Sequence, residues 1–216
     1  MVQSRFHRGM LVAAAAALLW AMLPVVASAQ GVVGEWKTVE PPPAPELKTV
    51  EVDPHTTALL VMDFLEVSCA PGSQHARPRC VRAIPKVKQL LDEARAQHML
   101  VIFTGFPQRS PIVKALTPMQ GEPLLVAHAD KFHGTDLDKI LKDHGITAVI
   151  ATGTSANGAV LFTAFGAAIR GYKVIVPVDT MPGANAYAEQ SSIWGIAHDP
   201  SLGTMSTLTS VDIIKF

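Results

Sequence analysis

Short apolar runs alternate with segments of helical hydrophobic spacing between residues 57 and 208. A nearly continuous apolar run is typical of a strand buried on both faces, whereas apolar residues three and four positions apart predict an amphipathic helix. The apolar runs predict strands at 57–63, 99–104, 124–127, 146–153, 172–178 and 204–208. The helical spacing predicts helices at 84–97, 135–144, 158–170 and 184–197. Thr135 is the expected N-cap of the second of these helices, and Gly145 is its expected C-cap.

Repeated strand–helix–strand units of this length predict a parallel sheet with helices on both faces. The expected fold class is α/β, a three-layer α/β/α sandwich with a mainly parallel sheet of about six strands. In such sheets the ligand binds beyond the carboxyl ends of the strands. Asp63, Thr104 and Gly153 end three of the predicted strands, so we expect the functional site near them.

The first 29 residues have the pattern of a secretory signal peptide. Arg5 and Arg8 form a basic start, Met10–Val26 is apolar, and Ala27-Ser28-Ala29 is a small-x-small cleavage site before Gln30. A membrane anchor is the competing interpretation, but the apolar run is short for a bilayer span. We therefore expect a periplasmic or secreted protein that keeps no stable membrane anchor after cleavage.

The mature chain divides into a proline-rich arm, residues 30–56, and one domain, residues 57–216. Pro41-Pro42-Pro43-Ala44-Pro45 is a stiff extended tether without helical potential. This arm would pack on the domain or on a partner subunit.

The charge balance argues against a nucleic-acid partner. The whole chain has 18 basic and 18 acidic residues, and without the leader 16 basic residues face 18 acidic ones. This balance provides neither a basic surface for nucleic acid nor a polybasic membrane patch. The sequence contains no motif for a nucleotide, flavin or haem cofactor, so we expect a small-molecule ligand and no cofactor.

The two cysteines, Cys69 and Cys80, flank a loop-like segment, residues 70–79. In an oxidising compartment an even pair across a short loop favours a disulfide. The alternative is that one of the two is a displaced nucleophile.

Three segments carry chemistry-bearing residues in a recognisable order. Leu59–Phe64 ends an apolar strand with Asp63, Asp130–Leu137 contains Lys131, and Ala151–Val160 joins a strand to a helix. Together they resemble the motifs of the isochorismatase-like hydrolases, and the resemblance runs from about Thr57 to Phe216.

The resemblance implies a role for each matched residue. Asp63 would act as general base or acid, and Lys131 would pair with it and favour its charged form. A cis peptide would join Thr154 and Ser155, and the backbone N–H groups of Ser155 and Ala159 would form an oxyanion hole. Members of the family commonly form dimers or larger assemblies, which leaves a homo-oligomer open.

Ala159 occupies the position of the family's nucleophilic cysteine. Alanine has no nucleophile, so any reaction here proceeds without covalent attack by that side chain. Thr154 and Ser155 are nearby hydroxyls, but residues 153–157 lack the second glycine of a nucleophile elbow. Two functions remain open: an acid–base hydrolase acting on a small molecule, or a non-catalytic binding protein that keeps the pocket.

The remaining candidates concern the pocket and a metal. Phe64, Phe106 and Phe132 would line an apolar pocket or pack in the core, and Asn157 would cap the helix or point into the site. We expect no metal, because the stretch 103–108 holds no ligand set where nicotinamidase-like members carry one. The nearby residues His128, Asp130 and His133 fit no standard zinc spacing.

Overall fold

The computed structural model describes residues 31–106 and 108–216, so the expected signal peptide and Gln30 lie outside the described residues. The chain divides into two compact units between Pro43 and Ala44. The described part of the first unit contains one short helix, α1 (Val32–Glu35). Within the described ranges no helix is both long enough and apolar enough to span a membrane.

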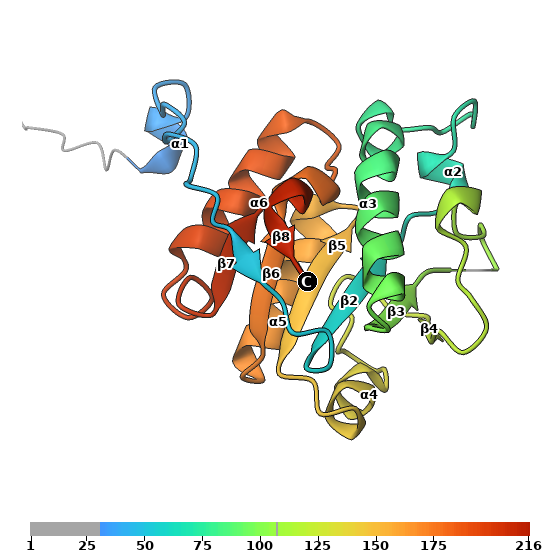
Figure 1. The fold of residues 1–216 in the computed structure, drawn as a ribbon. Coiled ribbons are helices and arrows are strands. Elements are labelled where there is room, and N and C mark those ends of the chain that lie inside the picture. The colour runs from blue at the N-terminus through green and yellow to red at the C-terminus, as the bar shows by residue number, and fades with distance from the viewer. Residues whose placement is uncertain (1–30, 107) are drawn as a thin grey trace, which may run out of the picture. The chain divides into compact units, whose positions relative to one another are not determined.

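A six-stranded sheet forms the centre of the second unit (Figure 1). Its strands lie in the order β4-β3-β2-β5-β6-β7, and every neighbouring pair is parallel, which confirms the predicted fold class. The strands are β2 (Thr57–Met62), β3 (Leu100–Thr104), β4 (Leu124–Leu125), β5 (Ala148–Gly153), β6 (Lys173–Pro177) and β7 (Ser206–Thr209).

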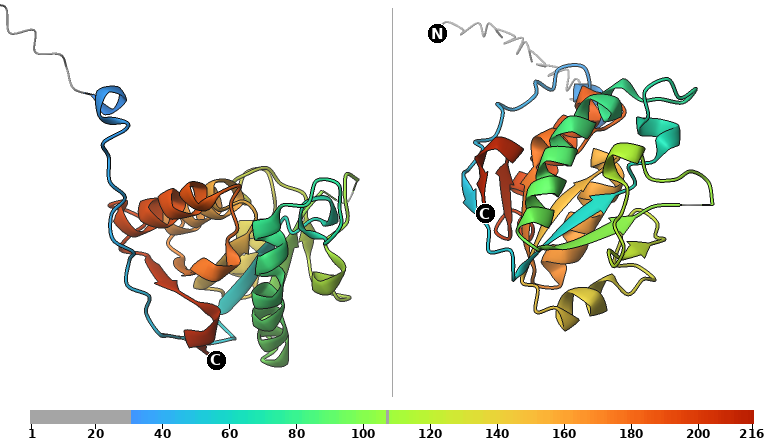
Figure 2. Two further views of the ribbon diagram at one scale, coloured as in Figure 1. Left: turned by 90° about the horizontal axis from the view of Figure 1, so that it is seen from above. Right: turned by 45° about the vertical axis from the view of Figure 1, so that its right-hand side comes forward.

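Helices cover both faces of this sheet, and two apolar cores fill the space between the layers (Figures 1 and 2). The central strands β2 and β5 are buried at every residue because they contribute side chains to both cores. One core packs α3 (Pro78–Ala96) on its face, and the other packs α4 (Leu137–Asp143), α5 (Leu161–Ile169) and α6 (Ala186–His198) on the opposite face.

Helix α3 begins six residues before the predicted start at residue 84. Pro78 occupies its first turn, where the missing N–H costs no hydrogen bond. Two other boundaries also differ. The predicted helix 158–170 opens as a π-helix, Ala156–Val160, before α5 begins, and the N-cap of α4 is Asp136 rather than Thr135.

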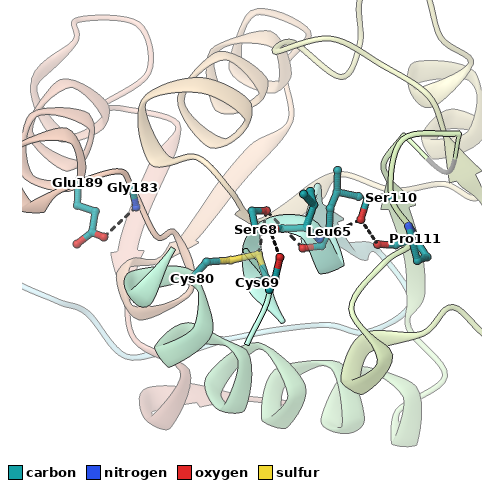
Figure 3. The surroundings of a disulfide bond; sticks show 10 residues. Leu65, Ser68, Cys69, Cys80, Ser110, Pro111, Gly183 and Glu189 are labelled. Atoms are coloured by element: carbon teal, nitrogen blue, oxygen red, sulfur yellow. Dashed lines mark hydrogen bonds between the residues drawn. A yellow bond between two sulfur atoms is a disulfide. The ribbon is translucent and has the colours of Figure 1, made fainter. Parts of the chain in front are cut away.

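The disulfide between Cys69 and Cys80 is present, which confirms the predicted pairing (Figure 3). It ties α2 (Glu66–Cys69), a helix that the apolar pattern did not predict, to the first turns of α3. Both cysteines are buried, and no thiol is left for a nucleophilic role.

Residues 44–52 of the predicted arm pack on their own domain. The Lys48 N–H donates to the Leu208 carbonyl oxygen of the edge strand β7 at 2.9 Å. The next residues form β1 (Val50–Glu51), which pairs in parallel with β8 (Ile214–Lys215). This part of the arm therefore covers the β7 edge, which would otherwise expose unpaired backbone groups.

Candidate active site

Asp63 lies at the carboxyl end of the central strand β2. The six residues before it are buried, and its own side chain keeps 16% of its surface exposed. Its φ of 57° is left-handed, a conformation that aspartate adopts more readily than most residues. The Asp63 N–H donates to the Thr104 carbonyl oxygen at 3.0 Å, which extends the β2–β3 ladder by one residue.

Lys131 provides the positive partner of this carboxylate. Its Nζ lies 2.5 Å from Asp63 Oδ2 and donates to the His128 carbonyl oxygen at 2.7 Å. Only 1% of the Lys131 side chain is exposed. A buried ammonium group needs charge and hydrogen-bond partners, and here a carboxylate and a backbone carbonyl supply them.

The loop that carries Lys131 is fixed against α5. The Lys131 N–H donates to Thr163 Oγ1 at 3.2 Å, and Thr135 Oγ1 donates to the Lys131 carbonyl oxygen at 2.5 Å. Gly166 lets the loop approach the helix, because a Cβ at this position would lie 2.7 Å from Asp130 Oδ1. These contacts between helix and loop therefore fix the position of the Lys131 ammonium group next to Asp63.

Thr104 completes the environment of Asp63, and the sequence reasoning noted it only as a strand end. Its hydroxyl donates to Asp63 Oδ1 at 2.7 Å, so each carboxylate oxygen has one side-chain partner. Thr104 pairs in register with Met62, the residue before Asp63. A hydroxyl ending the strand next to a candidate carboxylate is the signal that would have identified it.

The turn after β5 starts beside the same strand end. The Thr154 N–H donates to the Met62 carbonyl oxygen at 3.0 Å, and the Thr154–Ser155 peptide bond is cis, at the position implied by the resemblance. Gly153 permits this approach, since a Cβ there would lie 2.7 Å from Met62 Cβ. Ala159 follows in the π-helix and is 4% exposed.

The hydrogen bonds of this turn leave donors free. Ser155 donates its backbone N–H to no carbonyl of another described residue, and Ala159 lies in the first turn of the helical segment, where N–H groups lack intrahelical acceptors. No histidine among the described residues hydrogen-bonds to the Thr154 or Ser155 hydroxyl. The turn therefore offers backbone donors rather than an activated hydroxyl.

The structure separates the pocket candidates. Phe64 is fully buried in the core beneath α3, and Phe132 is buried against Tyr172 with ring centroids 6.0 Å apart. Phe106 lines a cavity, and its ring centroid lies 6.0 Å from Lys131 Nζ. Asn157 is exposed inside the π-helix and does not cap it.

The residues weighed as metal ligands have other contacts or are exposed. Asp130 Oδ1 accepts the Phe132 N–H at 3.0 Å, and His128 and His133 are exposed. Residues 31–106 and 108–216 contain no group of three histidine, cysteine or acidic side chains placed to hold a metal ion.

A second ion pair, between Arg79 and Glu189, joins the first turns of α3 and α6. Glu189 accepts a hydrogen bond from the Gly183 N–H (Figure 3). Burial raises the pKa of Glu189, but the hydrogen bonds from Arg79 and from this N–H outweigh it and leave the pKa below its usual value. Burial likewise raises the pKa of nearby Asp179, and there it prevails. The carboxyl edge of the sheet thus holds several partly buried carboxylates in different environments.

The fold and this edge together define a class: a parallel α/β sandwich with a buried lysine–aspartate ion pair and a turn with free backbone donors at adjacent strand ends. Residues 57–210 match the isochorismatase domain, and the chain belongs to that family. The names of the similar proteins in the next paragraph describe hydrolases.

Three known proteins illustrate the similarity. Maleamate amidohydrolase from Pseudomonas putida is 27% identical over 55% of this chain and 68% of its own length. A cysteine hydrolase from Pseudomonas syringae superposes with a TM-score of 0.67 at 21% identity, covering 79% of this chain and 95% of the other. N-carbamoylsarcosine amidase from Thermoplasma acidophilum gives a TM-score of 0.62 at 21% identity, covering 73% and 97%.

Proposed function

We propose that this chain is a hydrolase that cleaves a small molecule by acid–base chemistry, without a covalent cysteine intermediate. The observation that carries the proposal is the environment of Asp63. Thr104 and Lys131 fix its two carboxylate oxygens, yet the carboxylate stays partly exposed while its cation is enclosed. A fixed, reachable carboxylate beside a buried cation is suited to proton transfer.

The geometry supports a direct attack by water. Asp63, held in place by Lys131 and Thr104, accepts a proton from the attacking water. The backbone N–H groups of Ser155 and Ala159 stabilise the negative charge that develops on the substrate oxygen. Asp63 returns the proton to the leaving group, so the cycle ends with the carboxylate regenerated.

Small amides are the first substrates to test, because the curated relative is a maleamate amidohydrolase. The proposal predicts turnover of at least one amide and a loss of about 10²–10⁴-fold in kcat for Asp63→Asn. Asp130→Asn is the matched control. It changes a carboxylate of the Lys131 loop that does not touch the pair, and it keeps the oxygen that accepts the Phe132 N–H.

The main alternative is a non-catalytic binding protein on the same fold. In that case no amide is turned over, and Asp63→Asn changes only ligand affinity in a thermal-shift titration. Equal turnover by the parent and by Asp63→Asn would contradict the assigned role of this carboxylate.

Ala159→Cys tests whether the turn is a preserved active site. The introduced thiol is the only one in the chain, since Cys69 and Cys80 are paired. At the start of a helical segment it should have a lowered pKa and react with iodoacetamide faster than a free thiol does. Reaction no faster than glutathione at the same pH would argue against an active-site environment at this turn.

Export is the second part of the proposal, and the leader sequence supports it. A basic start, an apolar run and a small-x-small site predict cleavage before Gln30. Mass spectrometry of the protein purified from its host should find Gln30 at the N-terminus, and an intact Met1 in the soluble protein would contradict export by cleavage.

A further inference from the structure

A cavity of about 330 Å³ is lined by residues that follow the carboxyl ends of β2 and β3 and by Leu124 of β4. This volume is at the small end of the range for small-molecule sites. Most of its lining is apolar, and the main contributors are Leu65, Gly105, Phe106, Pro111, Ile112 and Leu124. Three of the lining residues, Leu65, Ser110 and Pro111, lie near one another in the close-up around the disulfide (Figure 3).

Gly105 leaves the space open. A Cβ at this position would lie 3.1 Å from Ile112 Cδ1, 3.3 Å from Leu65 Cδ2 and 3.9 Å from Leu124 Cδ1. The backbone of Gly105 is not in the left-handed region, so its conformation does not require glycine. Glycine at this position therefore keeps the cavity open, and its backbone conformation would allow other residues.

The cavity is built from the same strand ends as the acid–base pair. Leu65 follows Asp63 by two residues, and Gly105 follows Thr104, whose hydroxyl binds the Asp63 carboxylate. Phe106 belongs to both features, because it lines the cavity and its ring centroid lies 6.0 Å from Lys131 Nζ. A ligand in the cavity would thus contact the ring next to the reactive pair.

The charges at the cavity oppose one another. Glu66 and Lys114 both line it, and neither forms an ion pair with another described residue. One negative and one positive side chain beside an apolar interior give no net preference for a charged group. The chemistry therefore favours an uncharged apolar group.

We propose that this cavity binds an uncharged apolar group of the substrate. The substrate class is then a small amide with a compact aromatic or branched aliphatic substituent, whose amide reaches Asp63 while the substituent lies against Phe106. This inference rests on the proposed function, and its test separates the two by measuring binding apart from turnover.

The probe is phenylacetamide, and its affinity is measured by calorimetry on the Asp63→Asn variant, which should bind without turning over. Gly105→Leu should weaken binding by about 10- to 200-fold, the effect expected when an apolar group is shut out of its pocket. Ala115→Leu is the matched control, since it adds bulk at an exposed neighbour that does not line the cavity. It should leave the affinity unchanged.

A second variant covers the case in which Gly105→Leu does not fold. Leu124→Ala widens the cavity at a residue that is 41% exposed. It should improve binding of the larger probe 1-naphthylacetamide relative to phenylacetamide. Unchanged relative affinity for the two probes would overturn the proposal.

The outcomes for the two proposals differ. Turnover of maleamate without any binding of phenylacetamide would overturn the cavity proposal and leave the proposed function standing. Equal phenylacetamide affinity in Asp63→Asn with and without Gly105→Leu, with both folded, would also overturn it. Cavity-dependent binding with no turnover of any amide would refute the proposed function instead.

Discussion

Two ion pairs near the carboxyl edge of the sheet differ in what is buried. In the Lys131–Asp63 pair the cation is 1% exposed and the carboxylate 16%, whereas in the Arg79–Glu189 pair the cation is 34% exposed and the carboxylate 19%. Arg79 binds both oxygens of Glu189, and Glu189 also accepts the Gly183 N–H. The Glu189 carboxylate thereby accepts three hydrogen bonds, and its pair with Arg79 links α3 to α6.

The Lys131–Asp63 pair has the opposite distribution. Its cation is enclosed by the loop and by backbone carbonyls, while its carboxylate keeps 16% of its surface exposed. The comparison teaches that pairing alone does not mark a functional charge in this fold. The pairs differ in whether the cation is enclosed and in how many side-chain or backbone hydrogen bonds the carboxylate accepts, which are three at Glu189 and two at Asp63.

Replacing the cation of each pair should give the largest difference between the two pairs in the free energy of unfolding. Lys131→Met leaves Asp63 without its buried partner and should lower the free energy of unfolding by about 3–5 kcal/mol. Arg79→Met breaks a more exposed pair and should cost less, because water can replace part of the lost interaction. Urea unfolding of both variants measures the difference, and equal costs would contradict the contrast in burial.

Loss of the disulfide should have the next largest effect. Replacing both Cys69 and Cys80 with serine releases a short loop and should lower the free energy of unfolding by about 2–3 kcal/mol. Because Arg79 is adjacent to Cys80, the cost of Arg79→Met should change in this background, whereas that of Lys131→Met should not. A double-mutant cycle by urea unfolding checks both statements.

Two helix glycines test how the Lys131 loop is held. Gly166→Ala would place a Cβ 2.9 Å from Phe132 Cδ2, so overpacking should cost about 1–3 kcal/mol. Gly195→Ala is the matched change in α6, where the added Cβ would lie 3.9 Å from Leu161 Cδ1, an ordinary van der Waals contact. It should stabilise by up to about 1 kcal/mol through helix propensity, and a stabilising Gly166→Ala would show that the loop is not packed tightly there.

The smallest effect is expected at Asp179. Because burial raises the pKa of this carboxyl, its charge is unfavourable in the folded protein, and Asp179→Asn should stabilise the protein at neutral pH. The amide keeps an acceptor for the Val211 N–H. Below about pH 4 the carboxyl is protonated in both states, so the gain should vanish there. Thermal melts from pH 3 to pH 8 test this, and a gain that grows toward low pH would contradict it.

Much of the fold could be predicted from the sequence because its signals are local. Buried strands require continuous apolar runs, and the order of strands and helices along the chain restricts the sheet to a parallel arrangement. The start of α3 was missed, because a proline at its first turn and a disulfide-tied neighbour look like loop composition. The short strands β1 and β8 were missed because two residues carry no periodicity.

The candidate site divides in the same way. Asp63 and Lys131 stand in recognisable local segments, and Ala159 is evident as a missing nucleophile. The role of Thr104 depends on the register of β2 against β3, which no local pattern specifies. The three phenylalanines look alike in sequence, and only their packing distinguishes Phe106 from Phe64 and Phe132.

By itself, then, the sequence determined the α/β class, the disulfide and the residue types at the reactive position, since each depends on neighbours along the chain. The tertiary structure alone decided which end of the ion pair is reachable, that Gly105 keeps a cavity open, and that Phe106 borders both. These properties depend on distances between residues on different elements, such as Lys131 and Asp63, which are 68 positions apart, and close packing, rather than local propensity, sets such distances.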